Sequence, residues 1–162
     1  MNKISIIFVC TGNICRSPTA EAIFKSKIEG MGLTDFFLVD SAGTHGYHIG
    51  QSPDQRSVSA AKPYNYSFDG IKSRAFDVSI DYENDYIIAM DQSHLNWLLE
   101  NKPLECSSKI DLLMNFDQNS LSNVDIEDPY YGGEKGFKSV IEKIQCGIDK
   151  LIEHIKNETT FL

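Results

Sequence analysis

Residues 4–18 read ISIIFVCTGNICRSP, and this stretch decides the fold class. Residues 4–9 form an apolar run, which is typical of a buried β-strand. The loop that follows contains glycine and asparagine, the residue types that most readily adopt a positive φ in a tight turn. Beyond it, apolar residues recur at helical spacing, at Ala20, Ile23, Phe24, Ile28 and Met31. The order of strand, tight loop and helix predicts an anion-binding loop.

Cys10 and Arg16 stand at the two ends of this loop, with five residues between them. Backbone N–H groups of such a loop point inward, and the next helix adds the positive end of its dipole. A cradle of this kind binds a phosphate dianion and favours the thiolate form of a cysteine beside it. The pattern indicates Cys10 as a nucleophile and Arg16 as a clamp on phosphoryl oxygens. We also predict Ser17 as the helix N-cap and Pro18 as the first helical residue.

The spacing of Cys10 and Arg16 is by itself a weak signal, because the same two residues occur six positions apart in many proteins. The plain alternative is a buried structural cysteine followed by a capped helix, with no chemistry. The flanking strand, the residue types inside the loop and the helix after it favour the anion-binding interpretation.

The rest of the chain alternates apolar runs with amphipathic segments. Strands are predicted at residues 36–39, 86–90 and 110–113, helices at 53–62, after 91–93 and at 137–155, and loop at 114–136. This alternation predicts an α/β fold, a three-layer sandwich with a central, mostly four-stranded parallel sheet and helices on both faces. Ligands bind beyond the carboxyl ends of such strands, so Cys10, Ser41, Asp91 and Asp128 are expected at one edge.

Length and charge limit the classes of function. The chain has 162 residues, enough for one domain, which we predict to span residues 1–162. Its formal net charge of −8 opposes nonspecific binding to nucleic acid and to anionic membranes. No apolar stretch has the length of a membrane span, and the N-terminus lacks the pattern of a signal peptide. We therefore expect no membrane insertion and a cytoplasmic location.

The cysteines and histidines do not suggest a structural role for a metal or a disulfide. Cys10 and Cys15 share one loop, while Cys106 and Cys146 stand alone, so no disulfide framework is indicated. The sequence has no CxxC pair, and its four histidines lack a zinc-site spacing relative to the cysteines. We expect no metal and no other cofactor.

Two further regions make the chain recognisable. Residues 39–44 read VDSAGT and residues 50–54 read GQSPD, while residues 128–132 read DPYYG. Together with the loop at residues 10–18, these segments resemble the low-molecular-weight protein tyrosine phosphatases, matching the second strand and the general-acid loop of that family. The resemblance covers nearly the whole chain, and the two motifs together are more specific than either alone.

The resemblance implies metal-independent hydrolysis of phosphotyrosine in proteins through a cysteinyl-phosphate intermediate. Cys10 is then the nucleophile, Arg16 clamps the phosphoryl group, and Asp128 is the general acid that later activates water. Asp125 and Glu127 fit equally well on composition, and only the match to the family selects Asp128. The implied partners are phosphotyrosine-containing proteins, and the implied assembly is a monomer or a weak homodimer.

The resemblance also implies which residues bind the substrate. These are six residues of the loop and three tyrosines at the entrance: Thr11, Gly12, Asn13, Ile14, Cys15, Ser17, Tyr47, Tyr130 and Tyr131. Aromatic walls favour a flat aromatic leaving group, although one of the two adjacent tyrosines could instead anchor the core. Ser17 is implied to hydrogen-bond the thiolate as well as to cap the helix.

Finer expectations attach to the residues inside and behind the loop. Cys15 could trap an oxidised nucleophile as a disulfide, or simply be a small packed residue. Ile14 suits phosphotyrosine, whereas relatives that act on phosphoarginine look to carry threonine there. Asn13 and Ser41 would hold the loop through hydrogen bonds. The chain departs from the family at Ile71, where many relatives have a histidine. The sequence therefore leaves open whether the hydrogen bonds around Asn13 form.

Three other functions stay open on the sequence. A thiol-dependent arsenate reductase shares the loop and fold but needs further cysteines in relay, and Cys106 and Cys146 are widely spaced. A phosphoarginine phosphatase would use the same loop. A non-catalytic phosphate-binding module would have little use for Asp128, and this chain keeps the nucleophile, the arginine and the acid together.

Overall fold

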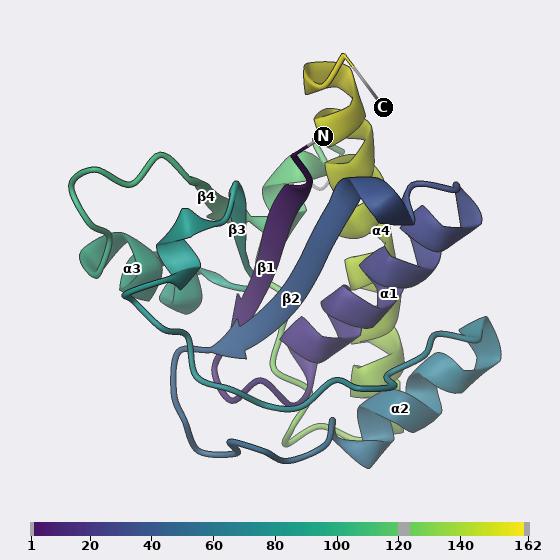
Figure 1. Cartoon of the computed structure of the whole chain (residues 1–162). Coiled ribbons are helices and arrows are strands. Elements are labelled where there is room, and N and C mark those ends of the chain that lie inside the picture. The colour runs from purple at the N-terminus through teal and green to yellow at the C-terminus, as the bar shows by residue number, and fades with distance from the viewer. Residues whose placement is uncertain (1, 120–123, 161–162) are drawn as a thin grey trace.

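The computed structural model describes residues 2–119 and 124–160. Among them, four strands form one parallel sheet in the order β2-β1-β3-β4 (Figure 1). The strands are β1 (Ile4–Cys10), β2 (Phe37–Gly43), β3 (Tyr86–Ala89) and β4 (Lys109–Leu112). The predicted α/β fold with a central four-stranded parallel sheet is confirmed.

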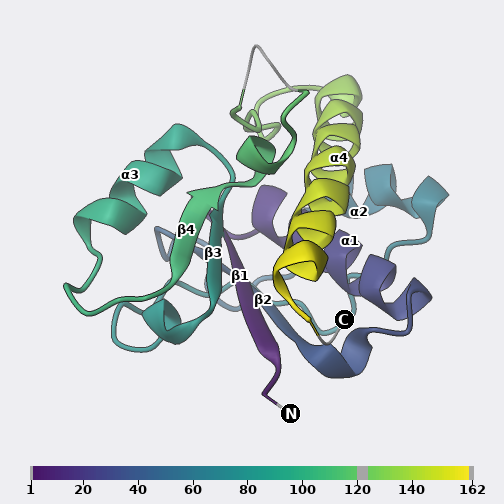
Figure 2. The ribbon, with the colours of Figure 1, turned by 90° about the horizontal axis from the view of Figure 1, so that it is seen from above.

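Helices cover both faces of this sheet, as Figure 2 shows from above. The helices are α1 (Arg16–Gly30), α2 (Gln55–Ala61), α3 (Gln92–Glu100) and α4 (Glu134–Glu158). Helices α1, α2 and α4 lie on one side and α3 lies on the other (Figures 1 and 2). Short 3₁₀ helices are η1 (Thr34–Phe36), η2 (Lys62–Tyr64), η3 (Asp81–Glu83) and η4 (Leu113–Phe116).

The continuous apolar run in β1 follows from this three-layer arrangement. Ile6 and Phe8 pack into the core cluster on the side of α1 and α4, whereas Ile7 and Val9 pack into the cluster that includes Leu98 of α3. Because successive side chains of a strand point to opposite faces, a strand with helices on both sides needs apolar residues at every position. The same reasoning accounts for the apolar run in β3, whose residues are all buried.

The start of α1 differs from the prediction. The helix begins at Arg16 with Cys15 as its N-cap residue, and no side chain caps it. Ser17 is therefore not the N-cap, because it lies inside the first turn and its hydroxyl contacts Cys10 and Asn13 instead. Pro18 is the third residue of α1 and not the first, and it is tolerated there because the N–H groups of the first turn need no intrahelical partner.

The other helix predictions hold with small changes. Met31 was expected on the buried face of α1, but it is the C-cap residue and is 49% exposed. The predicted final helix is confirmed, and α4 extends beyond the predicted range 137–155 at both ends. The predicted loop at residues 114–136 includes the end of η4 and the start of α4, and its residues 120–123 lie outside the described residues. Within the described ranges, no helix combines the length and apolar character of a membrane span.

The carboxyl edge of the sheet collects the segments that carry the candidate residues. The N–H of Thr44, just beyond β2, donates to Cys10 O at 2.8 Å, and the N–H of Met90, just beyond β3, donates to Val9 O at 3.1 Å. The N–H of Ile126 donates to Met90 O at 2.9 Å, although the two residues are far apart in the sequence. This last contact brings the 124–128 segment to the end of β3, the neighbour of β1 in the sheet.

Candidate active site

The nucleophile loop, residues 10–16, folds tightly between β1 and α1. Asn13 adopts the left-handed region with φ of 54°, a conformation that asparagine tolerates better than most residues. The end of β2 approaches the loop so closely that a Cβ on Gly43 would lie 2.6 Å from Thr11 O. Only glycine fits at that position without moving the loop. The N–H of His45 also donates to Thr11 O, at 3.0 Å.

Asn13 holds the loop from behind with three hydrogen bonds. Its Nδ2 donates to Ser17 Oγ at 2.8 Å and to Ser41 Oγ at 2.9 Å, and its Oδ1 accepts from the N–H of Arg74 at 2.9 Å. Asn13 is 1% exposed, so these contacts satisfy a buried amide. The support network is complete although Ile71 replaces the histidine of many relatives.

Cys10 has a hydroxyl donor beside its sulfur. The Cys10 side chain is buried, and its Sγ lies 3.0 Å from Ser17 Oγ. Because Asn13 Nδ2 can only donate, Ser17 Oγ accepts from it and keeps its own proton for a nearby acceptor. The sulfur of Cys10 is closer than the alternative acceptor, Ala42 O, at 3.4 Å. Ser17 Oγ therefore donates its proton toward the sulfur of Cys10.

Cys15 has the opposite environment, although it shares the loop. Burial raises the pKa of Cys15 to about 12, and the negative charge of Asp54 adds to the effect. Cys15 is therefore a neutral thiol near neutral pH. Both cysteines are free thiols in the structure, so a disulfide between them stays a prediction.

Arg16 is buried, and hydrogen bonds to one edge of its guanidinium fix its orientation. Nη1 donates to Asp91 Oδ2 at 2.6 Å and to Ile126 O at 2.9 Å. Nη2 makes longer contacts of 3.5 Å, to Thr11 Oγ1 and to Asp128 Oδ2. One edge of the fork is thus anchored in the protein, and the other can exchange its weak contacts for a ligand oxygen.

Asp91 and His94 form the N-terminal cap of α3 and reach the loop. Asp91 Oδ1 accepts from the N–H groups of Ser93 and His94, and His94 Nδ1 accepts from the N–H of Asp91 at 3.2 Å. His94 therefore carries its proton on Nε2, which donates to Thr11 Oγ1 at 2.8 Å. Burial raises the pKa of Asp91, but the hydrogen bonds and charges around it, including Arg16, outweigh this and lower it.

Sequence reasoning missed the role of His94. The available signal was the spacing of Asp91 and His94, which is that of a helix cap whose third helical residue bonds back to the cap. That spacing could have placed His94 at the start of α3. It could not have shown that the ring reaches Thr11.

The pH dependence of stability should report on His94. Burial lowers its pKa to about 4, with a further contribution from Arg16, against the opposing charges of Asp91, Asp125 and Asp128. The unfolded chain binds a proton near pH 6.5 and the folded chain does not, so acidification favours unfolding in this window. We expect the free energy of unfolding to fall by about 2–3 kcal/mol more in wild type than in His94→Gln between pH 7 and pH 4. Urea unfolding curves measure this difference, and equal slopes for the two proteins would contradict it.

A cavity of about 240 Å³ opens above the nucleophile loop. It is lined by Cys10, Thr11, Gly12, Ile14, Cys15, Arg16, Tyr47, His48, Asp128, Tyr130 and Tyr131. The structure thus brings together the predicted residues at one cavity, except that Asn13 and Ser17 stand behind the loop and support it. His48 was not predicted, and its sequence context, a loop rich in glycine and histidine, gave no specific signal.

The loop before α4 places Asp128 at this cavity. The neighbouring acids Asp125 and Glu127 do not line it. Asp128 Oδ1 accepts from the N–H of Tyr130 at 3.0 Å, and Oδ2 lies 3.5 Å from Arg16 Nη2. Its side chain is 47% exposed, so water and a substrate can reach it. The carboxylate of Asp125 instead accepts from the N–H of Gln92 at 2.9 Å, and Glu127 is exposed.

The three predicted tyrosines stand at the rim with different exposures. Tyr47 is 71% exposed and stacks on His45, with ring centroids 5.0 Å apart and planes 9° apart. Tyr130 is 36% exposed and meets Tyr131 edge to face at 5.0 Å. Tyr131 is 93% exposed, so it is not a core anchor. The rim of the cavity thus presents aromatic surface from two separate segments of the chain.

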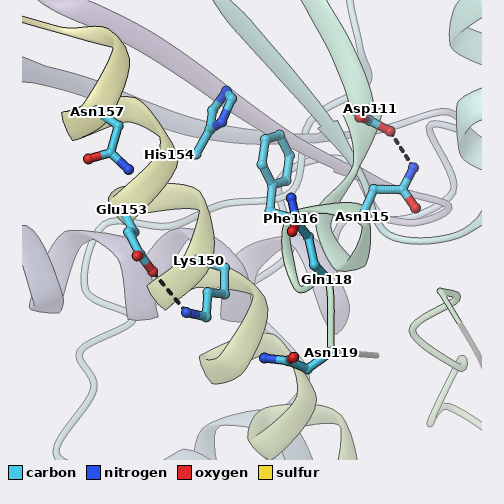
Figure 3. Close-up of a pocket in the computed structure, with 9 residues that line it drawn as sticks. All are labelled: Asp111, Asn115, Phe116, Gln118, Asn119, Lys150, Glu153, His154 and Asn157. Atoms are coloured by element: carbon cyan, nitrogen blue, oxygen red, sulfur yellow. Dashed lines mark hydrogen bonds and ion pairs between the residues drawn. The ribbon is translucent and has the colours of Figure 1, made fainter. Parts of the chain in front are cut away.

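Another cavity, of about 450 Å³, lies beside η4 and α4 (Figure 3). Its polar side chains bond with each other: Lys150 pairs with Glu153 at 2.8 Å, and Asn115 donates to Asp111 at 2.6 Å. Among the described residues that line it there is no cysteine and no arginine. The cavity at Cys10, which combines a cysteine with an arginine and a carboxylate, is therefore the candidate active site.

Comparison with known proteins agrees with this site. A model of the family described as low molecular weight phosphotyrosine protein phosphatase matches residues 5–160. A phosphatase of this description from Saccharomyces cerevisiae is 41% identical over 148 residues, covering 88% of this chain and 89% of the yeast protein.

Solved structures agree as well. A protein tyrosine phosphatase from Entamoeba histolytica matches with a TM-score of 0.89 and 39% identity, covering 96% of this chain and 99% of the other. A Drosophila arginine phosphatase matches with a TM-score of 0.87 and 32% identity, covering 95% of this chain and 99% of the other. By the extent of these matches, the chain is a protein tyrosine phosphatase and belongs to the low molecular weight phosphotyrosine protein phosphatase family.

Proposed function

We propose that this enzyme hydrolyses phosphotyrosine in proteins, with Cys10 as nucleophile, Arg16 as phosphoryl clamp and Asp128 as general acid and base. The observation that carries the proposal is the meeting of these three side chains at one small cavity. They come from the end of β1, the start of α1 and the loop before α4, and each is placed by contacts described above.

In the first step the Cys10 thiolate attacks phosphorus from the side opposite the ester oxygen. The S–P bond forms, the P–O ester bond breaks, and protonated Asp128 gives its proton to the departing phenolate oxygen. Arg16 Nη2 exchanges its 3.5 Å contact with Asp128 for the phosphoryl oxygens. Together with the N–H groups of the loop, it stabilises charge on the equatorial oxygens of the transition state.

In the second step water attacks the cysteinyl-phosphate. The Asp128 carboxylate accepts a proton from the water, a new P–O bond forms, and the S–P bond breaks to return the thiolate and release phosphate. The Ser17 hydroxyl, 3.0 Å from Cys10 Sγ, stabilises the thiolate as it leaves. No electron transfer is involved, so atoms and charge balance with water as the only co-reactant.

The rim favours an aromatic phosphoester. Tyr47, Tyr130 and Tyr131 line the opening, and Ile14 adds an apolar contact deeper in the cavity. A tyrosine ring fits between such surfaces by apolar and edge-to-face contact. A phosphoarginine substrate is the second candidate, because a similar structure is that of an arginine phosphatase, but the apolar side chain of Ile14 offers no partner to a guanidinium.

Arsenate reduction has less support from the structure. Cys15 shares the cavity with Cys10, but a relay of oxidising equivalents would require a further cysteine beyond this pair. Cys106 contacts Tyr82 O and Cys146 is exposed on α4, and neither lines the cavity.

Initial rates on three peptides test the proposal. We expect the enzyme, with EDTA and a reductant present, to hydrolyse a phosphotyrosine peptide at least about tenfold faster than phosphoarginine or phosphoserine peptides. Asp128→Ala should lower kcat/KM on the phosphotyrosine peptide by about 10²–10³, because the phenolate would leave unprotonated. The matched control is Glu127→Gln, which changes the exposed neighbouring acid and should stay within about threefold of wild type. Faster hydrolysis of the phosphoarginine peptide, or an inactive wild type, would overturn the proposed substrate.

A further inference from the structure

Arg56, near the N-terminus of α2, joins two segments that are separate in the sequence. Its Nε and Nη2 donate to the two carboxylate oxygens of Asp54, at 3.0 and 2.8 Å. Its Nη1 donates to Tyr130 O at 2.8 Å. The guanidinium carbon also lies 5.1 Å from the centre of the Tyr130 ring and 4.7 Å from that of Phe137. Arg56 is therefore fixed on both edges and between two aromatic rings.

The Asp54 end of this link is attached to the nucleophile loop. Asp54 is the N-cap residue of α2, where its carboxylate accepts from the N–H of Arg56. Its own N–H donates to Ile14 O at 2.8 Å. Asp54 is only partly exposed, and the hydrogen bond from Arg56 holds its pKa below the ordinary value, so the pair stays ionised at neutral pH. Arg56 is thus connected through Asp54 to the loop that contains Cys10.

The Tyr130 end is attached to the general acid. The N–H of Tyr130 donates to Asp128 Oδ1 at 3.0 Å, so the two residues form one short turn around Pro129. Among the described residues, the other polar contact from 127–132 to a separate segment is the 3.5 Å approach of Asp128 to Arg16. The phosphoryl oxygens of a bound substrate would occupy Arg16 Nη2 and so replace this contact. Arg56 is then the firm polar attachment on the C-terminal side of Asp128, whereas Ile126 on its N-terminal side is held by hydrogen bonds to Met90 and Arg16.

The geometry of these contacts indicates that Arg56 positions the turn at Asp128 rather than stabilises the fold. The Arg56 side chain is 46% exposed, so solvent screens the contribution of its ion pair with Asp54 to stability. By contrast, a guanidinium that makes two hydrogen bonds to a carboxylate and packs against aromatic rings has a fixed orientation. The flexible ammonium of a lysine lacks such a fixed orientation. Small displacements of a reacting group can lower a rate by a large factor, about 10² for 1 Å.

We propose that Arg56 is a positioning residue for the reaction: it sets the place of the Asp128 carboxyl relative to the nucleophile loop by linking Ile14 and Asp54 to Tyr130. This inference rests on the proposed role of Asp128 as the acid. It assigns Arg56 no contact with substrate. Its effect should therefore appear only where proton transfer to the leaving group limits the rate.

Two substrates with different leaving groups separate placement from general damage. Phenyl phosphate needs protonation of a poor leaving group, whereas 4-nitrophenyl phosphate expels a much more stable anion. We expect Arg56→Ala to lower kcat/KM about tenfold on phenyl phosphate and no more than about twofold on 4-nitrophenyl phosphate. Arg56→Lys should show most of the same loss, because one ammonium cannot bond Asp54 and Tyr130 O together.

Lys109→Ala is the matched control. Lys109 also pairs with a carboxylate, that of Glu158, and lies over an aromatic ring, 5.3 Å from the centre of Tyr86. It begins β4, at the end of the sheet away from the nucleophile loop. Its loss should leave the ratio of the two kcat/KM values unchanged, whatever it does to the melting temperature.

A double-mutant cycle completes the test. In an Asp128→Ala background, Arg56→Ala should cause no further loss on phenyl phosphate, because there is no acid left to misplace. A loss that persists in that background, or one equal for both substrates, would overturn the inference. If Asp128→Ala itself shows no leaving-group dependence, the proposed function fails. If Asp128→Ala shows it and Arg56→Ala does not, only the positioning role fails.

Discussion

Cys10→Ser is expected to lower turnover of phosphotyrosine substrates by at least about 10⁴-fold while the phosphate cradle stays formed. An alcohol is a far weaker acid than a thiol, so the hydroxyl at this position would remain protonated near neutral pH. The Ser17 hydroxyl at 3.0 Å can stabilise a thiolate, but a single donor cannot create an alkoxide. Arg16 and the loop N–H groups do not depend on the sulfur, so binding of inorganic phosphate should persist.

Three measurements check this expectation. Steady-state kinetics should show the loss in kcat, and calorimetric titration should give phosphate affinities within about tenfold for wild type and Cys10→Ser. Intact-mass analysis of acid-quenched wild type should show one added phosphoryl group, which the variant lacks. The control is Cys146→Ser, because Cys146 is exposed on α4 and outside the cavity. A Cys10→Ser variant that keeps more than about a hundredth of the activity would remove Cys10 from the role of nucleophile.

The parts of the fold that the sequence predicted are those set by local patterns. The buried run at 86–90 and the amphipathic pattern at 137–155 each depend on the faces that one element buries, and both are confirmed as β3 and α4. The same holds for residues 4–9, whose alternate side chains serve two different core clusters. The order of the strands in the sheet, which no local pattern expresses, came only from the structure.

Ser17 shows why a local rule can give the wrong residue. Serine before proline is a good N-cap signal, and nothing nearby in the sequence contradicts it. In the structure the Ser17 hydroxyl is taken by Asn13 Nδ2 and Cys10 Sγ, so the helix starts at Arg16 without a side-chain cap. A competing tertiary contact decided the boundary. The chemistry of the loop thus outweighed the ordinary preference for a capped helix.

Two of the contacts that the sequence did not predict cross long distances in the chain. His94 reaches Thr11, and Arg56 reaches the carbonyl of Tyr130, each joining segments more than 70 residues apart. Motifs identify which residues carry chemistry because the reaction demands certain side chains. They do not identify the residues that hold those side chains in place, because many different side chains could do so. Those supporting residues could be identified only from the structure.

Arg16→Lys should lower kcat/KM for phosphotyrosine substrates by about 10³, although the positive charge is kept. The guanidinium does two things at once: Nη1 is held by Asp91 and Ile126 O, and Nη2 faces the cavity. A lysine ammonium at this buried site would go to Asp91 and leave the phosphoryl oxygens without their donor. A loss of about 10³ corresponds to about 4 kcal/mol of transition-state stabilisation.

Inhibition by phosphate and by vanadate separates binding of the ground state from binding of the transition state. Vanadate takes the Cys10 sulfur as a fifth ligand, as phosphorus does in the displacement, so its equatorial oxygens make the transition-state contacts with Arg16, whereas bound phosphate stays tetrahedral. We expect the vanadate affinity of Arg16→Lys to fall at least about tenfold more than its phosphate affinity. Equal losses for the two anions would mean that Arg16 binds the substrate and its transition state alike. A kcat/KM within about tenfold of wild type would mean that a point charge suffices, and that the fork aimed by Asp91 adds little to catalysis.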